Sequence, residues 1–497
     1  MSDKSPIRPE EAGDPSLGVN RVVSRREFLK IAGVAGAAVG MGAGLGGLLS
    51  ACGEEETTTT AGATTTTGAQ TTTTGGATTT VTTTAEMGPE IKIGFVTPQT
   101  GGLASFGIPD MYCVERWREA IGDGMVLGDG KKHPITITVA DSQSDNNRAA
   151  QVAGDLINNT GCHIMTCAST PSTVLATVEQ CEAYATPVVS TDCPWQVYLR
   201  GEPLKNEYKW SYHVFFGSED FLTCNEATWA MMQTNKTVGL MLPNDEDGIY
   251  YRKAWPPFLE AKGYNYVDGG AYQNMTEDFT SIITAFKNGG VEIVTGVVIP
   301  PDFTNFWKQC AQQDYLPKVC SIGKAILFPE SVDAVGELGN GLLTELWWHR
   351  TFPFKSYFTG ETCAQLADDY EKRTNQQQTA PLLHYMVGEW AIWALQNATD
   401  PTSKDSILAA IEKTKLDTIV GPIDFTGEVM PPGPAELLGY TPGPGRKHKN
   451  LYDHGLGEAQ WLMLGGKWTF EQVPVSNAAA PYMAADTLQA PKPLPIT

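Results

Sequence analysis

Residues 91–107 read IKIGFVTPQTGGLASFG, an apolar run that ends in a glycine-rich turn. Short apolar runs bounded by proline and glycine are typical of buried strands. A helical pattern follows over residues 111–120, and residues 133–145 (HPITITVADSQSD) predict a second strand that ends in a polar loop. A strand, a helix and a further strand in this order favour a parallel α/β sheet.

The same alternation of strands and helices continues along the chain. Strand-like apolar runs lie within residues 163–170 and 186–191, and a second series begins near Ser211. In that second series we expect strands within residues 237–248, 264–272, 293–303 and 318–326. Helical spacing is found in residues 146–159, 171–185, 280–287, 304–313, 362–375, 382–398 and 405–415. The sequence therefore predicts two doubly wound, Rossmann-like α/β lobes.

Four segments together resemble the leucine/isoleucine/valine-binding family of solute-binding proteins. They are IKIGFVTPQTGGLASFG (91–107), VADSQSDNNRAAQVAGDLI (139–157), ATPVVST (185–191) and DTIVGPIDFTGEV (417–429). The resemblance implies a type I periplasmic-binding-protein fold, in which a three-strand hinge joins two lobes that close over a ligand. It also implies service to an ATP-driven importer, without catalysis.

The resemblance also implies a division of the chain. We expect the three crossovers between the lobes near Tyr212, Trp348 and Thr426. The predicted segments are a signal peptide (1–52), a threonine-rich linker (53–89), an N-terminal lobe (90–212 and 349–426), a C-terminal lobe (213–348 and 427–480) and a tail (481–497). Residues 460–473 (QWLMLGGKWTFEQV) predict a hairpin near the end of the second lobe.

Ligands of such sheets bind beyond the carboxyl ends of the strands. In the first lobe these ends are the loops 97–107, 141–145, 168–173 and 191–195. The resemblance implies that small and hydroxyl residues in these loops hold a ligand carboxylate, helped by backbone N–H groups at a helix start. The candidates are Thr170, Ser172, Thr173, Asp192 and Cys193, with Phe106 and Trp195 as an aromatic wall.

These first-lobe candidates have ordinary structural alternatives. Ser172 and Thr173 could simply cap the following helix, and Pro171 lacks an N–H for any anion. Phe106 could be a loop aromatic, and Trp195 could pack on the surface.

The second lobe departs from the pattern of the family. Asp247, with Tyr250 close behind, stands where the family has a tyrosine before a glycine, and Lys324 replaces the acidic residue that receives a ligand ammonium. A buried lysine would repel an ammonium. Lys324 could therefore receive an anionic group, pair with Asp247, or lie in solvent. Trp347, near the second crossover, could form the floor of the cleft or pack in the core.

The N-terminus carries two processing signals in order. Arg25 and Arg26 in SRREFLK fit the twin-arginine export pattern, and an apolar run over residues 31–49 ends at LSAC, a lipobox-like site with Cys52. A transmembrane helix is the alternative, although the run contains many glycines. Threonine then fills most of residues 57–84, which predicts a flexible tether. We therefore expect an exported protein, held by a lipid on Cys52 at the outer face of the cytoplasmic membrane.

Composition narrows the functional classes further. The net charge of -21 disfavours nucleic-acid binding. The ten cysteines form no CxxC pair, so we expect no metal site, and we expect buried thiols that act as small hydrophobic side chains, plus one or two disulfides. The body contains no GxSxG, HExxH or Walker motif, and we expect no cofactor.

The preferred hypothesis is a monomeric solute-binding protein for a small amino acid or other small organic acid, with ABC permease subunits as partners. The alternatives are a ligand-sensing lipoprotein and an exported enzyme.

Overall fold

A computed structural model describes residues 85–199, 208–427, 444–445 and 447–495 of the chain. The expected export signal with Arg25 and Arg26, the lipidation site Cys52 and most of the threonine-rich linker lie outside these described residues. Among the described helices, none has both the length and the apolar character needed to cross a bilayer.

The first lobe is built on a sheet with the order β15–β16–β7–β6–β5–β1–β4, as far as the described residues extend. Its strands are β1 (Ile91–Thr97), β4 (Ile135–Asp141), β5 (Ile164–Cys167), β6 (Val188–Ser190), β7 (Ser211–Val214), β15 (Lys447–His448) and β16 (Leu451–Tyr452). Strand β1 pairs in parallel with β4 and β5. Six of its seven residues are buried, which explains why the opening run is almost continuously apolar.

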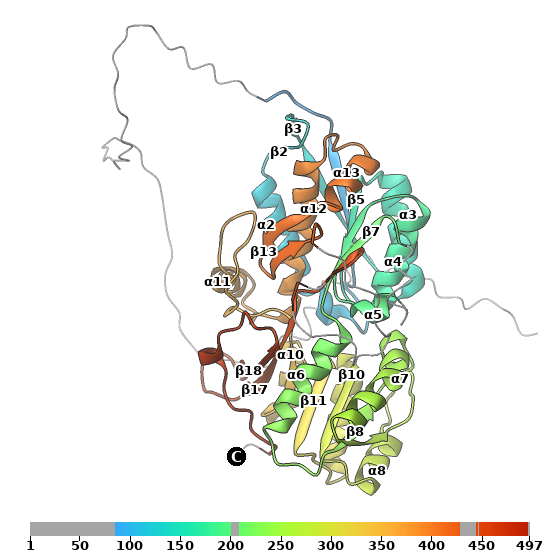
Figure 1. Cartoon of the computed structure of the whole chain (residues 1–497), viewed down its shortest axis with the longest axis vertical. Coiled ribbons are helices and arrows are strands. Elements are labelled where there is room, and N and C mark those ends of the chain that lie inside the picture. The colour runs from blue at the N-terminus through green and yellow to red at the C-terminus, as the bar shows by residue number, and fades with distance from the viewer. Residues whose placement is uncertain (1–84, 200–207, 428–443, 446, 496–497) are drawn as a thin grey trace, which may run out of the picture. The chain divides into compact units, whose positions relative to one another are not determined.

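Helices cover both faces of this first sheet. They are α2 (Asp110–Ile121), α3 (Asn146–Asp155), α4 (Pro171–Ala183), α5 (Trp195–Tyr198), α11 (Cys363–Thr374), α12 (Tyr385–Asn397) and α13 (Lys404–Ile411), and the short helix η4 (Ala380–His384) leads into α12. Helices α3 and α4 lie on one face, and α2 and α12 lie on the other (Figure 1). Small hairpins, β2 (Met125–Val126) with β3 (Lys132–His133) and β13 (Lys415–Thr418) with β14 (Gly421–Asp424), extend this lobe.

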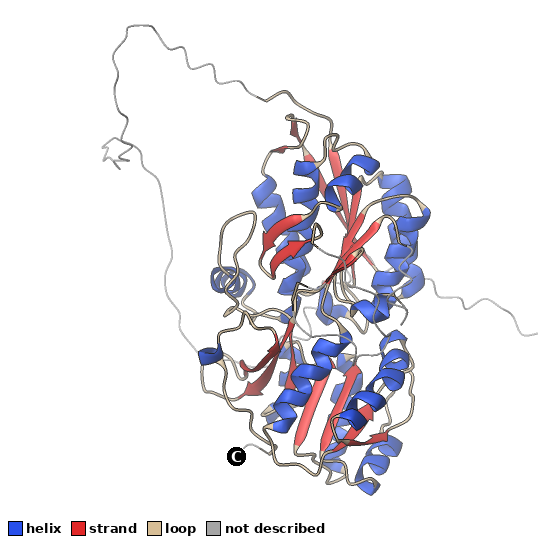
Figure 2. Ribbon diagram, viewed as in Figure 1, coloured by secondary structure: helices blue, strands red, loops and turns tan. Residues whose placement is uncertain are grey.

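The second lobe has a sheet in the order β18–β17–β12–β11–β10–β8–β9, again within the described residues. Its strands are β8 (Thr237–Met241), β9 (Asn265–Asp268), β10 (Ile293–Val298), β11 (Val319–Lys324), β12 (Leu343–Leu346), β17 (Leu456–Leu462) and β18 (Glu471–Ala479). Its helices are α6 (Ser218–Ala230), α7 (Glu246–Ala261), α8 (Thr280–Asn288), α9 (Pro300–Gln312) and α10 (Pro329–Asp333). Figure 2 shows the strands of each sheet as a layer between helices. The predicted hairpin is confirmed, because β17 and β18 pair antiparallel.

The chain passes between the two sheets at three places. It leaves β7 for α6 through residues 215–217, and it leaves β12 for the first lobe after Leu346. The third crossing differs from the expectation near Thr426. Strand β16 still pairs with β7, so the chain enters the second sheet only between Tyr452 and Leu456. Strands of two residues within a region rich in proline and glycine carry too little pattern to be seen in the sequence.

The cysteines of the described residues are all buried and unpaired. The expectation of buried thiols is confirmed, but the expectation of one or two disulfides is wrong for this part of the chain. These thiols face the core, as Cys113 does in α2 and Cys310 does in α9. These cysteines therefore act as small apolar side chains.

Candidate functional site

Several non-glycine residues at the carboxyl ends of strands have a positive φ. They are Gln143 (54°), Ser144 (59°), Ser169 (136°), Asp192 (69°) and Lys324 (66°). Such a backbone conformation costs about 1–3 kcal/mol per residue and persists where surrounding contacts enforce it, often at functional sites. The strain therefore marks the loops that the sheet topology brings together.

These loops surround two adjoining cavities between the lobes. The inner cavity is narrow, with about 10 Å³ of free volume, which is room for roughly one water molecule. It is lined by Ser169, Thr170, Pro171, Asp192, Pro194, Phe215, Phe216, Asp247, Tyr251, Val297, Lys324, Glu345 and Trp347. The outer cavity has a volume of about 390 Å³ and is bounded by residues such as Ser144, Ser172, Asn244, Asp245 and Asn274. Thr170 and Lys324 line both cavities, so they stand where one opens into the other.

Six candidates from the sequence come together around these cavities. The structure places Thr170, Ser172, Asp192, Asp247, Lys324 and Trp347 in the lining. They come from both lobes, although more than 170 residues separate the first from the last in the sequence. The carboxyl ends of β5, β6 and β11 bring three of them, Thr170, Asp192 and Lys324, to one cleft.

The other five candidates lie outside the lining. Thr173 turns inward, and its hydroxyl donates to the Thr170 carbonyl at 3.4 Å. Cys193 and Trp195 are buried in the core of the first lobe, and Tyr250 packs on the Tyr251 ring at 5.4 Å. Phe106 lies behind the cavity wall, with its ring 5.9 Å from that of Trp347 and 4.8 Å from that of Phe328. These side chains support the site from behind because they face the core.

At the start of helix α4 the structure shows no side-chain capping hydrogen bond, so the alternative that Ser172 and Thr173 simply cap this helix is not borne out. Thr170 is the N-cap residue, and its hydroxyl contacts Ser172 Oγ at 3.0 Å and does not cap the backbone. Ser172 and Thr173 stand in the first turn of α4, where backbone N–H groups have no partner within the helix. Pro171, which has no N–H, occupies the first helical position, where none is required.

Lys324 is buried and paired. Its ammonium lies 2.8 Å from Asp247 Oδ2 and 3.7 Å from Asp245 Oδ2, and the residue is 7% exposed. Burial alone lowers the pKa of Lys324, but the carboxylates of Asp247 and Asp245 outweigh it, so the pKa is raised and the side chain stays charged. Of the three expectations for Lys324, pairing with Asp247 is the one that the structure confirms.

Asp192 belongs to a buried chain of charges. His384, the last residue of η4, contacts Asp110 Oδ1 through Nδ1 at 2.6 Å and contacts Asp192 Oδ2 through Nε2. Burial alone lowers the pKa of His384, but Asp192 and Asp110 outweigh it and raise the pKa to about 10. The imidazolium therefore holds Asp192 in place at the cavity wall.

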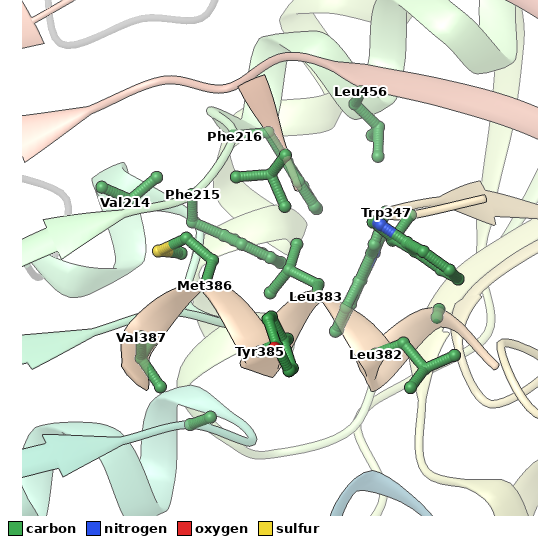
Figure 3. Packing of buried hydrophobic residues seen from close by; sticks show 14 of the residues in the cluster. Val214, Phe215, Phe216, Trp347, Leu382, Leu383, Tyr385, Met386, Val387 and Leu456 are labelled. Carbon is green, nitrogen blue, oxygen red and sulfur yellow. The ribbon is translucent and has the colours of Figure 1, made fainter. Parts of the chain in front are cut away.

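Aromatic side chains from the crossing segments form the floor of the inner cavity. Phe215 and Phe216 follow β7, Trp347 follows β12, and the rings of Phe215 and Trp347 meet edge to face at 4.9 Å. Figure 3 shows these rings packed against Leu383 of the η4 segment. Trp347 Nε1 donates to Glu345 Oε2 at 2.8 Å, and burial raises the pKa of Glu345 to about 8.

Several site residues could not be predicted from the sequence. Phe215, Phe216, Tyr251, Val297 and Glu345 line the inner cavity, yet each lies in a run that is typical of the core. His384 lies 274 residues from Asp110 and 192 from Asp192, so no local pattern could join them.

Comparison with known proteins identifies the family of the chain. Residues 90–431, more than half of the chain, match the periplasmic binding protein family. The chain belongs to the periplasmic binding protein family. This confirms the resemblance and the type I fold that the sequence predicted. Residues 22–42 match the twin-arginine translocation signal, so the signal and the binding domain together indicate export from the cytoplasm.

Solved structures have the same architecture at low sequence identity. A leucine-binding protein from Thermotoga maritima MSB8 aligns with a TM-score of 0.62 at 15% identity, over 77% of this chain and 97% of that protein. A branched-chain amino acid transporter substrate-binding protein from Streptococcus pneumoniae, in complex with isoleucine, has a TM-score of 0.58 at 15% identity, over 78% and 99%. An ABC transporter solute-binding protein from Rhodopseudomonas palustris BisB5, in complex with 3,4-dihydroxybenzoic acid, has a TM-score of 0.59 at 15% identity, over 78% and 96%. At these identities the similarity shows the fold.

Proposed function

We propose that the chain is the lipid-anchored solute receptor of an ABC importer. It captures a small amino-acid-like or carboxylate-bearing ligand between its lobes and delivers it to a permease. The observation that carries this proposal is the pair of cavities lined by polar side chains of both lobes, among them Thr170 and Asp192 from the first and Asp247 and Lys324 from the second.

A ligand held there bridges the lobes and stabilises their closed arrangement. Backbone N–H groups in the first turn of α4, together with the hydroxyls of Thr170 and Ser172, receive a carboxylate at the mouth of the inner cavity. Trp347 and Phe215 contact the apolar part of the ligand. Opening and closing occur at the three crossing segments as a hinge motion. The similar structures, which hold isoleucine and 3,4-dihydroxybenzoic acid, support a small ligand with a carboxyl group.

The proposed anchor is a lipid on Cys52, which becomes the first residue after the signal is removed. The threonine-rich segment then acts as a tether that lets the monomeric body reach the permease from the outer face of the cytoplasmic membrane.

A ligand screen tests the binding part of the proposal. The purified chain is mixed with amino acids and small carboxylic acids, and its thermal unfolding is followed. A ligand that binds only the folded state raises the midpoint with concentration. The proposal expects at least one such compound, and it fails if no compound in either class raises the midpoint.

Cell experiments test the anchor and the partner. Replacement of Cys52 by Ala is expected to move the exported protein from the membrane to the soluble fraction, and unchanged membrane association would contradict the anchor. Deletion of the permease is expected to abolish uptake of the identified ligand. Persistent uptake would favour a sensing role.

A further inference from the structure

Two aspartates from opposite lobes face the inner cavity with an unused oxygen each. Asp192 and Asp247 both line the cavity, and each is 2% exposed. Asp192 Oδ2 accepts hydrogen bonds from His384 Nε2 and from the Ser169 N–H, and Asp247 Oδ2 accepts from Lys324 Nζ. The Oδ1 atom of each aspartate is buried and has no hydrogen-bond partner among the described residues.

An unpartnered carboxylate oxygen inside a protein is unfavourable, because the oxygen has lost its hydration without a replacement. A group that donates hydrogen bonds can satisfy it. The charged donors at the cavity are already used, since Lys324 is directed at Asp247 and Asp245. Trp347 Nε1, another donor in the lining, is bound to Glu345. The hydroxyls of Ser169 and Tyr251 in the lining are also without a partner among the described residues, and each can donate or accept. The charged groups that the cavity offers to a ligand at this point are therefore the two carboxylates, which accept hydrogen bonds.

The charged side chains around the inner cavity also carry a net negative charge. Asp110, Asp192, Asp245 and Asp247 carry four carboxylates, against the two cationic side chains His384 and Lys324. Aromatic side chains also line the cavity, among them Phe215 and Trp347. Aromatic faces attract cations, and they do so more strongly where water is excluded.

We propose that the inner cavity is a subsite for a cationic hydrogen-bond donor, a protonated amine or an amidinium, which bridges Asp192 of one lobe and Asp247 of the other. This inference rests on the proposed function and specifies its ligand class. A ligand of this class carries its amino group into the inner cavity, and any carboxylate it has lies outwards, near Thr170 and Ser172. Because the bridge joins the lobes, the same contact that selects the ligand also stabilises closure.

The test uses matched cationic and anionic probes on the full-length chain. Tyramine and benzamidine are compared by calorimetry and thermal unfolding with 3-(4-hydroxyphenyl)propionate and benzoate, which have similar rings but a carboxylate. Calcium chloride is added as a separate arm, because carboxylate oxygens are also ligands for a hard cation. The inference expects binding of at least one amine or amidine, and tighter binding of it than of its carboxylate counterpart.

Two variants place the binding at the aspartates. Asp192→Asn and Asp247→Asn each remove one charge of the bridge and are expected to weaken amine binding by about tenfold or more. The matched control is Asp302→Asn, because Asp302 is also buried with an unpartnered Oδ2 but does not line the inner cavity. The affinity of this variant for the amine is expected to equal that of the parent chain. If Asp192→Asn fails to fold through loss of the His384 contact, Asp247→Asn alone decides.

Three results would overturn the inference: tighter binding of the carboxylate probes, stabilisation by calcium in place of the amines, or an amine affinity in both aspartate variants that is unchanged from that of the parent chain. If carboxylates bind and the amines do not, the inference fails while the proposed receptor function stands. If none of the four probes binds, the inference fails, and the screen of amino acids and carboxylic acids decides the receptor function separately.

Discussion

Replacing Lys324 by Met tests whether the cleft contains a desolvated ion pair. The substitution keeps most of the apolar stem and removes the ammonium. It leaves Asp247, which is 2% exposed, without the cation that lies 2.8 Å from its Oδ2. The remaining carboxylate is then buried beside Asp245. Its negative charge is repelled by Asp245 and is no longer balanced by the ammonium of Lys324.

The expected loss of stability is large. Breaking a buried pair by removing one partner costs about 3–5 kcal/mol, which is a large part of the stability of an ordinary domain. Burial already raises the pKa of Asp247 to about 6 with Lys324 present. Without Lys324 this pKa rises further, and the carboxyl avoids its penalty by taking up a proton. The penalty is therefore expected to be smaller at pH 5 than at pH 8, because Asp247 is protonated in the folded state at the lower pH.

Urea unfolding followed by tryptophan fluorescence measures this loss at both pH values. The control is Lys318→Met, because Lys318 lies in the same lobe and pairs with Glu292 at 2.9 Å, but its side chain is 48% exposed. An exposed pair contributes less than about 1 kcal/mol, so the control is expected to unfold almost like the parent chain. Equal effects of the two substitutions, or a penalty for Lys324→Met that does not depend on pH, would refute the reasoning.

Three further predictions concern other parts of the site and core. His384 has a folded pKa of about 10, above its ordinary 6.5, so its contribution to stability is complete below about pH 6.5 and is lost as the pH rises through about 10. The difference in unfolding free energy between the parent chain and His384→Gln should shrink over that range, and a constant difference would contradict the charged contact with Asp110 and Asp192. Thr170→Ala should weaken ligand binding, whereas Thr173→Val should change stability by less than about 1.5 kcal/mol and leave affinity intact; the opposite pattern in calorimetry would exchange their roles. The described cysteines should be unreactive to a thiol reagent in the folded protein and reactive after unfolding without a reductant, and a disulfide found by mass spectrometry would contradict this.

The fold was predictable because its signals are local. The run over residues 91–97 is buried on both faces of a parallel sheet, and the alternation of such runs with helical spacing repeats through both lobes. The third crossing was not predictable. Strands β15 and β16 have two residues each, and their place in the first sheet depends on pairing with β7, more than 230 residues earlier in the chain.

The site was predictable only where it coincides with strand ends. Thr170 and Asp192 follow strands and Lys324 ends one, so sheet topology alone directs them to the cleft. Their neighbours Thr173 and Cys193 lie on the same segments, but their side chains point to the core, a distinction that depends on local backbone direction. The charge of His384 depends on two carboxylates that are distant in the sequence, and the aromatic floor depends on where the crossing segments meet.

The most direct test of the account is a crystal structure of the full-length chain with the tightest-binding compound from the ligand screens. The account predicts density for that compound between Asp192 and Asp247, with an apolar part against Trp347 and contacts to both lobes. A compound bound elsewhere on the molecule, with nothing between these two aspartates, would contradict it.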